Sequence, residues 1–384
     1  MGVQFAKDMG LKSWFSIAEI EPQAIEQVKN VCSIPNVFKW VALMPDVHPG
    51  FGMPIGGVVA FKDKLIPNAV GVDIGCGVVM VKTDIRACEA EYNIRKVLSS
   101  TLEEIPVGFK KRKRAVVSSI WEDVPEDQVI QKERKNAALQ LGTLGGGNHF
   151  IEIQKATDEN VVLMVHSGSR HLGKAVADYY NKVARAYLKN KETDYPPGLA
   201  WLPLDSKQGR DYYEAMRFCL RYASENRRIM IDILLELMGK HFGAFRTLER
   251  LETIHNYASL ESHYREEVMV HRKGAVRASG KVIIPGSMGT QSYVGLGLEN
   301  AESFKSCSHG AGRVMGRKQA RERIDYETVM DELSRSGISV VSPDRRSIVE
   351  EARETYKDID EVMVLQKDLV KPLERLVPLG VMKG

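Results

Sequence analysis

The stretch VVLMVHSGSRHLGKAVADYYNKVARAYLK, residues 161–189, passes from a strand pattern into a helix pattern across a glycine-containing turn. Its first five residues are apolar and mostly valine, which is typical of a buried strand. From about residue 173 to residue 189, apolar residues recur at helical spacing. A strand that leads directly into a helix indicates a chain of the mixed α/β class.

Similar patterns extend over the rest of the chain, and no internal repeat or linker-like tract interrupts them. We therefore predict one compact α/β body over residues 1–384, with mixed α+β content and mixed β-sheets flanked by helices. The predicted strands cover 38–44, 58–61, 78–83, 149–153, 161–165, the neighbourhood of Thr253, 268–271 and 282–284. The predicted helices cover 22–31, about 173–189 and about 209–238, and others begin near Gly312, Tyr326 and Ser347.

Composition indicates a globular protein with a sizeable core, because 43% of the 384 residues are hydrophobic and 27% are charged. The longest nearly apolar stretch, residues 229–238, contains two acidic residues and is shorter than the roughly 18 residues that span a bilayer. We expect no membrane-spanning segment. The first residues lack the pattern of a signal peptide, so we expect a cytoplasmic protein. Five irregularly spaced cysteines should be thiols.

Net charge gives little guidance, because 54 Lys and Arg residues against 50 Asp and Glu residues leave only +4. The one dense basic block is KKRKR, residues 110–114. Five adjacent positive charges could lie against nucleic-acid phosphates. They could equally form a solvated loop or helix end, and the sequence leaves both interpretations open.

Most of the nine histidines lie in glycine-rich, turn-like stretches. Glycine lets the backbone approach a ligand closely, although it costs conformational entropy on folding. Its repeated pairing with imidazole indicates binding sites, whereas a single such histidine is more often structural. The stretches are MPDVHPG (44–50), GGGNH (145–149), HSGSRH (166–171) and SHGAGR (308–313).

A further stretch, GVDIGCG at residues 71–77, offers a carboxylate and a thiol three residues apart. Asp73 and Cys76 could point at one cation, or the stretch could be a tight turn with a buried cysteine. With three histidines they could form a shell of oxygen, sulfur and nitrogen ligands that suits Zn(II) and tolerates Mn(II), Fe(II) or Co(II). If the thiolate bridges, two cations could be bound side by side. The three histidines are His149, His166 and His255.

Residues 168–175, GSRHLGKA, nearly match the phosphate-binding loop G-x-x-x-x-G-K-[ST]. Ala175 stands where that loop needs a hydroxyl to bind magnesium, so we do not predict a nucleotide hydrolase of that type. The stretch is better interpreted as an anion-contacting turn between a strand and a helix. His166 and Arg170 are its functional side chains.

The sequence resembles the RtcB family of RNA ligases over almost its whole length, and its motifs follow the family order. Besides the stretches named above, the resemblance rests on residues 145–152, HNY (255–257), HRKGA (271–275), PGSMGT (285–290) and the terminal MKG (382–384). It implies a GTP- and Mn(II)-dependent enzyme that acts in tRNA splicing or RNA repair. Such an enzyme joins an RNA end bearing a 2′,3′-cyclic phosphate or 3′-phosphate to an end bearing a 5′-hydroxyl. Its RNA partners would be tRNA halves or other cleaved RNA ends.

The resemblance also implies roles for individual residues. His309 would be the nucleophile that carries GMP, and Cys76 would bridge two Mn(II) ions. The other metal ligands would be Asp73, His149, His166 and His255. Contacts to guanine and phosphate would come from Asn148, Glu152, Ser287, Ser292, Tyr356 and Lys383. Arg170, Arg272 and Arg317 would hold phosphate or the RNA backbone.

Local chemistry agrees with these implied roles. The backbone amides around Ala311 and Gly312, and Arg313 at the start of a helix pattern, can hold phosphate. A neutral imidazole beside them can attack the α-phosphate of GTP. Glu152 can accept hydrogen bonds from guanine N1 and N2, which adenine does not offer, and this would favour GTP over ATP.

Two other functions stay open from the sequence. A metal-dependent RNA phosphatase or cyclic phosphodiesterase would use the same metal ligands without a nucleotide, and a non-catalytic RNA-binding protein would use the basic run and the arginines. The interval between Cys76 and His149, which contains residues 110–114, is shorter than in longer RtcB proteins, so RNA docking could differ. The sequence does not fix the oligomeric state or the need for a helper protein.

Overall fold

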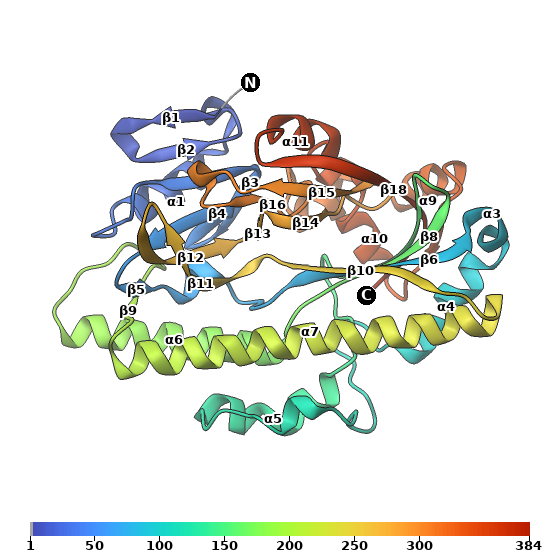
Figure 1. The fold of residues 1–384 in the computed structure, drawn as a ribbon, viewed down its shortest axis with the longest axis horizontal. Coiled ribbons are helices and arrows are strands. Elements are labelled where there is room, and N and C mark those ends of the chain that lie inside the picture. Colours follow the sequence, from blue (N-terminus) through green and yellow to red (C-terminus); the bar gives the residue numbers. More distant parts are fainter. Residues whose placement is uncertain (1–2) are drawn as a thin grey trace.

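Two large β-sheets and the helices around them make up residues 3–384, the part of the chain that the computed structural model describes (Figure 1). The class is mixed α/β, as the sequence predicts. The first sheet consists, in spatial order, of β1 (Gln4–Ala6), β2 (Leu11–Ser13), β3 (Val41–Phe51), β4 (Met53–Phe61), β12 (Glu266–Lys273) and β11 (Asn256–His263).

The second sheet contains the strands on which the site is built. In spatial order it consists of β10 (Thr247–Ile254), β6 (Gly77–Arg86), β8 (Asn160–Ser167), β7 (Phe150–Ala156), β18 (Val370–Lys383), β15 (Ser292–Leu298) and β14 (Ser279–Ile284), with β17 (Ser339–Val341) beside β18. Two short pairs are separate: β13 (Ala275–Arg277) with β16 (Ser306–Ser308), and β5 (Lys64–Leu65) with β9 (Leu202–Pro203).

The longest helix, α7 (Lys207–Phe242), packs against β6 and β8, and α6 (Arg170–Asn190) lies alongside it (Figure 1). The buried face of α7 carries Phe218, Met230 and Leu234, and burial of each such apolar side chain stabilises the fold by roughly 1.5–3 kcal/mol. The other helices are α1 (Pro22–Cys32), α2 (Pro67–Val70), α3 (Ala87–Ala90), α4 (Ile94–Glu104), α5 (Gln128–Gln140), α8 (Arg317–Arg323), α9 (Tyr326–Arg335), α10 (Arg345–Glu350) and α11 (Ile359–Leu365). Among residues 3–384, no helix is long and apolar enough to cross a membrane.

Antiparallel pairing brings motifs that are distant in the sequence together at one end of the strands of the second sheet. Gly77 at the start of β6 pairs with Ser167 at the end of β8 and with Ile254 at the end of β10. Phe150 at the start of β7 pairs with Lys383 at the end of β18. Because neighbouring antiparallel strands run in opposite directions, the start of one lies beside the end of the next. The residues just beyond these strand ends therefore meet in space.

Two local predictions from the sequence are wrong. The stretch at residues 44–50, predicted as a turn, is part of β3, whose pairing with β4 shifts register between Leu43 and His48. The helix predicted from about Gly312 begins only at Arg317, because Gly312 has a positive φ of 76° that an α-helix does not accept. Arg313 therefore lies in a loop and not at a helix start.

The near-match to a phosphate-binding loop is not a loop in the structure. Helix α6 already begins at Arg170, so Gly173 and Lys174 lie inside it. The ammonium of Lys174 is exposed and pairs with Asp178 one turn further on. The backbone N–H of His171 donates to the side chain of Gln140 and that of Gly173 to the carbonyl of Ser169, so these amides do not form a cradle for phosphate.

Candidate active site

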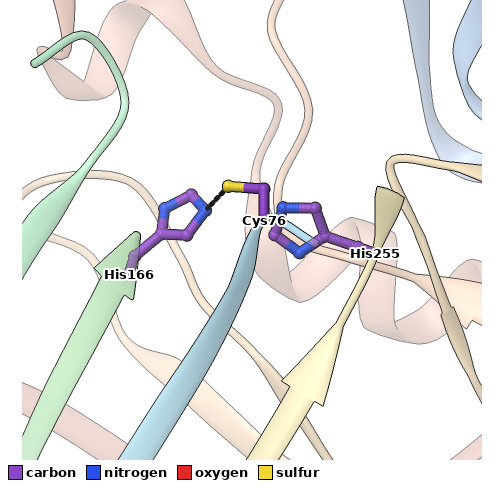
Figure 2. A group of neighbouring side chains, drawn as sticks. All are labelled: Cys76, His166 and His255. Atoms are coloured by element: carbon purple, nitrogen blue, oxygen red, sulfur yellow. Dashed lines mark hydrogen bonds between the residues drawn. The ribbon is translucent and has the colours of Figure 1, made fainter. Parts of the chain in front are cut away.

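Cys76 lies at the centre of a buried cluster of metal-ligand side chains. Its Sγ is 3.4 Å from Nε2 of His149 and 3.3 Å from Nε2 of His166. Figure 2 shows Cys76, His166 and His255 pointing toward one another from separate segments. Two groups have all their ligand atoms within 4.8 Å of one another: Cys76 with His166 and His255, and Cys76 with Asp73 and His149. The sequence-predicted ligands therefore converge, and both groups share the thiol.

Backbone carbonyls fix the orientation of two of these imidazoles. Nδ1 of His149 lies 3.0 Å from the carbonyl oxygen of Leu144, and Nδ1 of His166 lies 3.1 Å from that of Asn148. A carbonyl can only accept, so each Nδ1 carries a hydrogen. Nε2 of His166 faces the sulfur of Cys76 with its lone pair, whereas Nε2 of His149 lies near that sulfur and 2.9 Å from Oδ2 of Asp73. A cation between such acceptors would relieve their repulsion.

Burial decides the charge states of the cluster. It lowers the pKa values of His166 and His255 well below the usual range, and neighbouring histidines lower them further. It raises the pKa of Cys76 well above its usual value, and Asp73 adds to this rise. The imidazoles of His166 and His255 are thus neutral ligands, while the thiol needs a nearby cation to lose its proton.

The ligand set also contains a buried atom that lacks a partner. Nδ1 of His255 makes no hydrogen bond within residues 3–384, although the side chain is buried. Such an atom costs free energy unless something else binds the ring or reaches that nitrogen. Imidazoles, a carboxylate and a thiol around one point suit a divalent transition metal, so the residues present fit a cation.

His309 lies directly beside this cluster and is held by Asp46. The ring centroids of His255 and His309 are 4.8 Å apart. Oδ2 of Asp46 lies 2.6 Å from Nδ1 of His309 and accepts a further hydrogen bond of 2.9 Å from its backbone N–H. Burial alone would raise the pKa of Asp46, but the charge and hydrogen bonds of His309 outweigh it and lower that pKa. Asp46 thus keeps the hydrogen on Nδ1 and leaves Nε2 free.

Gly312 allows the loop after His309 to pack against the strand that carries Asp46. Its φ is +76°, and a Cβ atom placed on it would lie 2.3 Å from the carbonyl oxygen of Asp46. A side chain at this position would push the two segments apart. The glycine therefore explains how the loop at 310–312 approaches Asp46 so closely.

A cavity of about 510 Å³ opens next to His309. Most of the residues predicted to bind nucleotide line it, together with His166, a predicted metal ligand. The predicted residues in its wall are Asn148, Glu152, Ser287, Ala311, Gly312, Arg313, Arg317, Tyr356 and Lys383. His48, Val72 and Glu351, for which no role is predicted, also line it.

Glu351 contacts the charged side chains that line one wall of this cavity. It pairs with Arg313 at 3.1 Å, with Arg317 at 3.3 Å and with Lys383 at 3.8 Å, and it accepts a hydrogen bond from the hydroxyl of Tyr356. These cations lower the pKa of Glu351, although burial alone would raise it. Glu351 therefore stays ionised and positions the four side chains around it.

Arg313 and Arg317 differ in how many of their guanidinium N–H groups are free to bind a ligand. Arg313 also donates to the backbone carbonyl of Glu350 at 2.7 Å and to the hydroxyl of Tyr356 at 3.1 Å. Most of its donors are thus already engaged. The side chain of Arg317 is 45% exposed and is the freer of the two to reach a phosphate.

Two residues predicted to touch the ligand do not line the cavity. Arg272 is completely buried and donates to Glu261 and to the carbonyl of Phe304, so it cannot clamp RNA. Ser292 is also buried, and its hydroxyl accepts from the backbone N–H of Gly286 at 3.2 Å. The expectation for Arg272 is corrected, because this residue stabilises the first sheet. The role of Ser292 stays a prediction, and in the structure its hydroxyl supports the loop that presents Ser287.

Arg170 supports His149, a predicted metal ligand, and does not line the cavity. Its guanidinium donates to the carbonyl of Gly108 at 3.1 Å and to Oγ1 of Thr143 at 3.3 Å, and it lies 3.5 Å from Nδ1 of His149. Its predicted role as a phosphate clamp is therefore replaced by a role in holding the His149 segment.

Sequence reasoning missed Asp46, Glu351 and Arg227. Asp46 lies in a quoted motif, but nothing in the sequence pairs it with His309. Arg227 lies within α7 and Glu351 directly follows α10, and neither belongs to a motif. The buried guanidinium of Arg227 donates to the carbonyls of Gly75 at 2.8 Å and Ser167 at 2.6 Å, which joins two segments that carry metal ligands.

A family model described as "tRNA-splicing ligase RtcB" matches residues 27–125 and 112–384. The chain belongs to the RtcB family. Among RtcB relatives, a protein named RNA-splicing ligase RtcB1 from one Escherichia coli strain is 36% identical and covers 97% of each chain. RNA-splicing ligase RtcB from Escherichia coli K12 is 35% identical with the same coverage. A tRNA-splicing ligase RtcB from Thermococcus kodakarensis is 32% identical over 95% of this chain and 92% of its own length.

Proposed function

We propose that this RtcB-family chain is an RNA ligase for tRNA splicing or RNA repair, which uses GTP and Mn(II). It joins an RNA 2′,3′-cyclic phosphate or 3′-phosphate to an RNA 5′-hydroxyl. The single observation that carries the proposal is the position of His309, whose Nδ1 is held by Asp46 beside the Cys76 cluster and at the wall of the cavity. The names of the relatives, which are RNA-splicing and tRNA-splicing ligases, support it.

The two ligand groups would hold the cations. Cys76, His166 and His255 would bind one Mn(II), and Cys76, Asp73 and His149 would bind the other. Bound there, Mn(II) supplies positive charge that neutralises phosphate oxygens. Arg317 adds charge from the cavity wall.

His309 performs the covalent step. Its Nε2 attacks the α-phosphorus of GTP, so an N–P bond forms and the bond to pyrophosphate breaks. The imidazole gains positive charge, which the carboxylate of Asp46 balances through Nδ1. An oxygen of the RNA 3′-phosphate then attacks the phosphorus of the histidine-bound GMP and breaks the N–P bond. Finally the 5′-hydroxyl attacks the RNA phosphate and GMP leaves, whereas a cyclic phosphate is first opened by water.

Glu152 is the residue proposed to select guanine. It is 4% exposed, accepts a hydrogen bond of 2.7 Å from Nε2 of Gln154, and lines the cavity. Its carboxylate would accept from guanine N1 and N2. Tyr356 offers its ring for stacking, and Asn148, Ser287 and Lys383 supply further polar contacts.

The experiment that tests the function offers the protein two RNA fragments, one with a 3′-phosphate and one with a 5′-hydroxyl, together with GTP and Mn(II). We expect a joined product that requires both GTP and Mn(II), and a protein that becomes covalently labelled by GTP carrying a radioactive α-phosphate. Phosphate removal that proceeds equally without GTP, and no joined product, would instead indicate a metal-dependent phosphatase.

Guanosine binding should weaken as the pH falls. Burial raises the pKa of Glu152 to about 8, with Gln154 and Lys383 opposing the rise. Below this pH the free protein holds a protonated Glu152, which must lose its proton before it accepts from guanine. We expect the affinity for guanosine, titrated without metal, to fall by up to about tenfold per unit below pH 8. The Glu152→Gln variant should bind weakly at every pH, and an equal pH dependence in that variant would contradict this role.

Replacing Asp46 by asparagine should slow GMP transfer to His309 without weakening GTP binding. The amide has nearly the same shape, but it cannot balance the positive charge on the imidazole or hold the hydrogen on Nδ1 as firmly. We expect single-turnover labelling to slow by about 10²- to 10⁴-fold, with an unchanged Kd for GTP and an unchanged Tm. Labelling at the unmodified rate would show that Asp46 does not orient His309.

A further inference from the structure

The basic loop, residues 109–114 between α4 and α5, exposes positive charge that has no counter-ion. Its three lysines and Arg114 are exposed, and none of them forms an ion pair with another residue in the range 3–384. Other surface lysines, such as Lys174, pair with an acidic residue one helical turn away. Unpaired cations on a single loop create a local field that attracts a polyanion.

The same loop begins with an aromatic ring that has no packing partner. Phe109 is 101% exposed, so its ring gains nothing from burial in the protein. Nucleic-acid bases stack on such rings whatever their sequence. An exposed ring beside unpaired cations is the combination that binds single-stranded nucleic acid.

Arg112, the remaining basic residue of the loop, anchors the loop to the protein. Nε and Nη2 of Arg112 donate to the carbonyls of Leu141 at 3.1 Å and Gly142 at 2.8 Å. The backbone N–H of Arg112 donates to the carbonyl of Leu139 at 2.9 Å. Arg112 therefore fixes the loop on the segment that follows α5, while its neighbours stay exposed to solvent.

Gly108, the residue just before the basic loop, lies close to the cavity. The backbone N–H of Gly108 donates to the carbonyl of Gly145 at 2.8 Å. Gly145 is three residues before Asn148, which lines the cavity, so the chain between them spans at most about 11 Å. Arg170 joins Gly108 to the His149 segment. The basic loop thus projects from the segment that supplies a cavity wall and a metal ligand.

We propose that the basic loop is the docking surface for single-stranded RNA next to the reacting end. The lysines and Arg114 contact the phosphates, and Phe109 stacks on one base. The inference rests on the proposed function, because the docked strand must place its end in the same cavity. Phosphate contacts and stacking carry no sequence information, so the loop holds RNA of any sequence.

The first test removes the exposed charges and keeps Arg112. The loop variant combines Lys110→Gln, Lys111→Gln, Lys113→Gln and Arg114→Gln. Its affinity for a fluorescent single-stranded RNA with a 3′-phosphate is measured by anisotropy at several salt concentrations. We expect binding at low salt to weaken by at least about tenfold. The dependence of log K on log salt should become shallower, by about 0.7 for each lost phosphate contact.

A matched control removes four cations elsewhere. It combines Lys182→Gln, Arg185→Gln, Lys189→Gln and Lys191→Gln, four exposed residues in the second half of α6 or just beyond its end. Because an α-helix rises 1.5 Å per residue, the Cα atoms of these residues lie about 18 Å or more along the helix from that of Arg170 at its start. We expect RNA affinity close to that of the unmodified protein. An equal loss in the control and the loop variant would overturn the proposal.

A second variant, Phe109→Ala, separates stacking from charge. It should weaken RNA binding by about fivefold or more and leave the salt dependence unchanged. Both variants should accept GMP from GTP at the normal rate, because labelling needs no RNA. If the unmodified protein labels and joins RNA but neither variant weakens RNA binding, the docking proposal fails alone. If the unmodified protein neither labels nor joins RNA, the proposed function fails, whatever the loop binds.

Discussion

Replacing His309 by alanine should abolish the covalent GMP label completely. In the structure His309 is the histidine that is both held by Asp46 and next to the Cys76 cluster, and it lines the cavity. Alanine removes the attacking nitrogen, and no activated nucleophile remains there to form the N–P bond. Labelling is measured with GTP and Mn(II), and RNA joining of 3′-phosphate ends should vanish in parallel.

The controls for this variant separate chemistry from folding. His309→Ala should keep its Tm and its Mn(II) content, because His309 is not in either ligand group. His171→Ala provides a matched histidine variant, since His171 belongs to the HSGSRH stretch but is exposed and lies near Glu133. It should label normally. A label of full strength on folded His309→Ala protein would disprove the assignment of the nucleophile.

Replacing Cys76 by serine should have the next largest effect. The sulfur is common to both ligand groups, so its loss weakens two cation sites at once. A serine hydroxyl has nearly the same size but does not ionise near neutral pH. We expect Mn(II) content and GMP labelling each to fall by more than about 100-fold.

Measuring proton release when Mn(II) binds tests the role of Cys76 independently. Burial and Asp73 raise the pKa of Cys76, so the thiol holds its proton until a cation binds. Adding Mn(II) to the metal-free protein should release this proton, and Cys76→Ser should not release it. Cys88→Ser, which changes an exposed thiol, should behave as the unmodified protein. Equal proton release in the Cys76 and Cys88 variants would exclude Cys76 as a ligand.

Much of the local structure could be predicted from the sequence, because periodicity and turn residues act over short distances. Residues 22–31 and 209–238 were predicted as helices and correspond to α1 and α7. Four of the five predicted metal ligands could be proposed because they lie in glycine-rich stretches, where such side chains have few structural uses, whereas His255 lies in a stretch without glycine. Their convergence depends on antiparallel pairing of β6, β8 and β10, which no local pattern specifies.

Pairings between distant side chains could not be predicted. Asp46 and His309 are 263 residues apart, and only the packing of the Gly312 loop on β3 brings them together. Arg272 looked like a phosphate clamp because guanidinium favours phosphate. Its position inside the first sheet next to Glu261 is a tertiary feature, so charge alone gave the wrong expectation.

The most direct test identifies the residue that carries GMP. The protein is incubated with GTP and Mn(II), digested under mildly alkaline conditions that preserve a phosphoramidate, and the labelled peptide is fragmented in a mass spectrometer. The structure leads us to expect GMP on His309 alone, attached through Nε2, because Asp46 occupies Nδ1. A label on a lysine, on another histidine or on no residue would contradict the account.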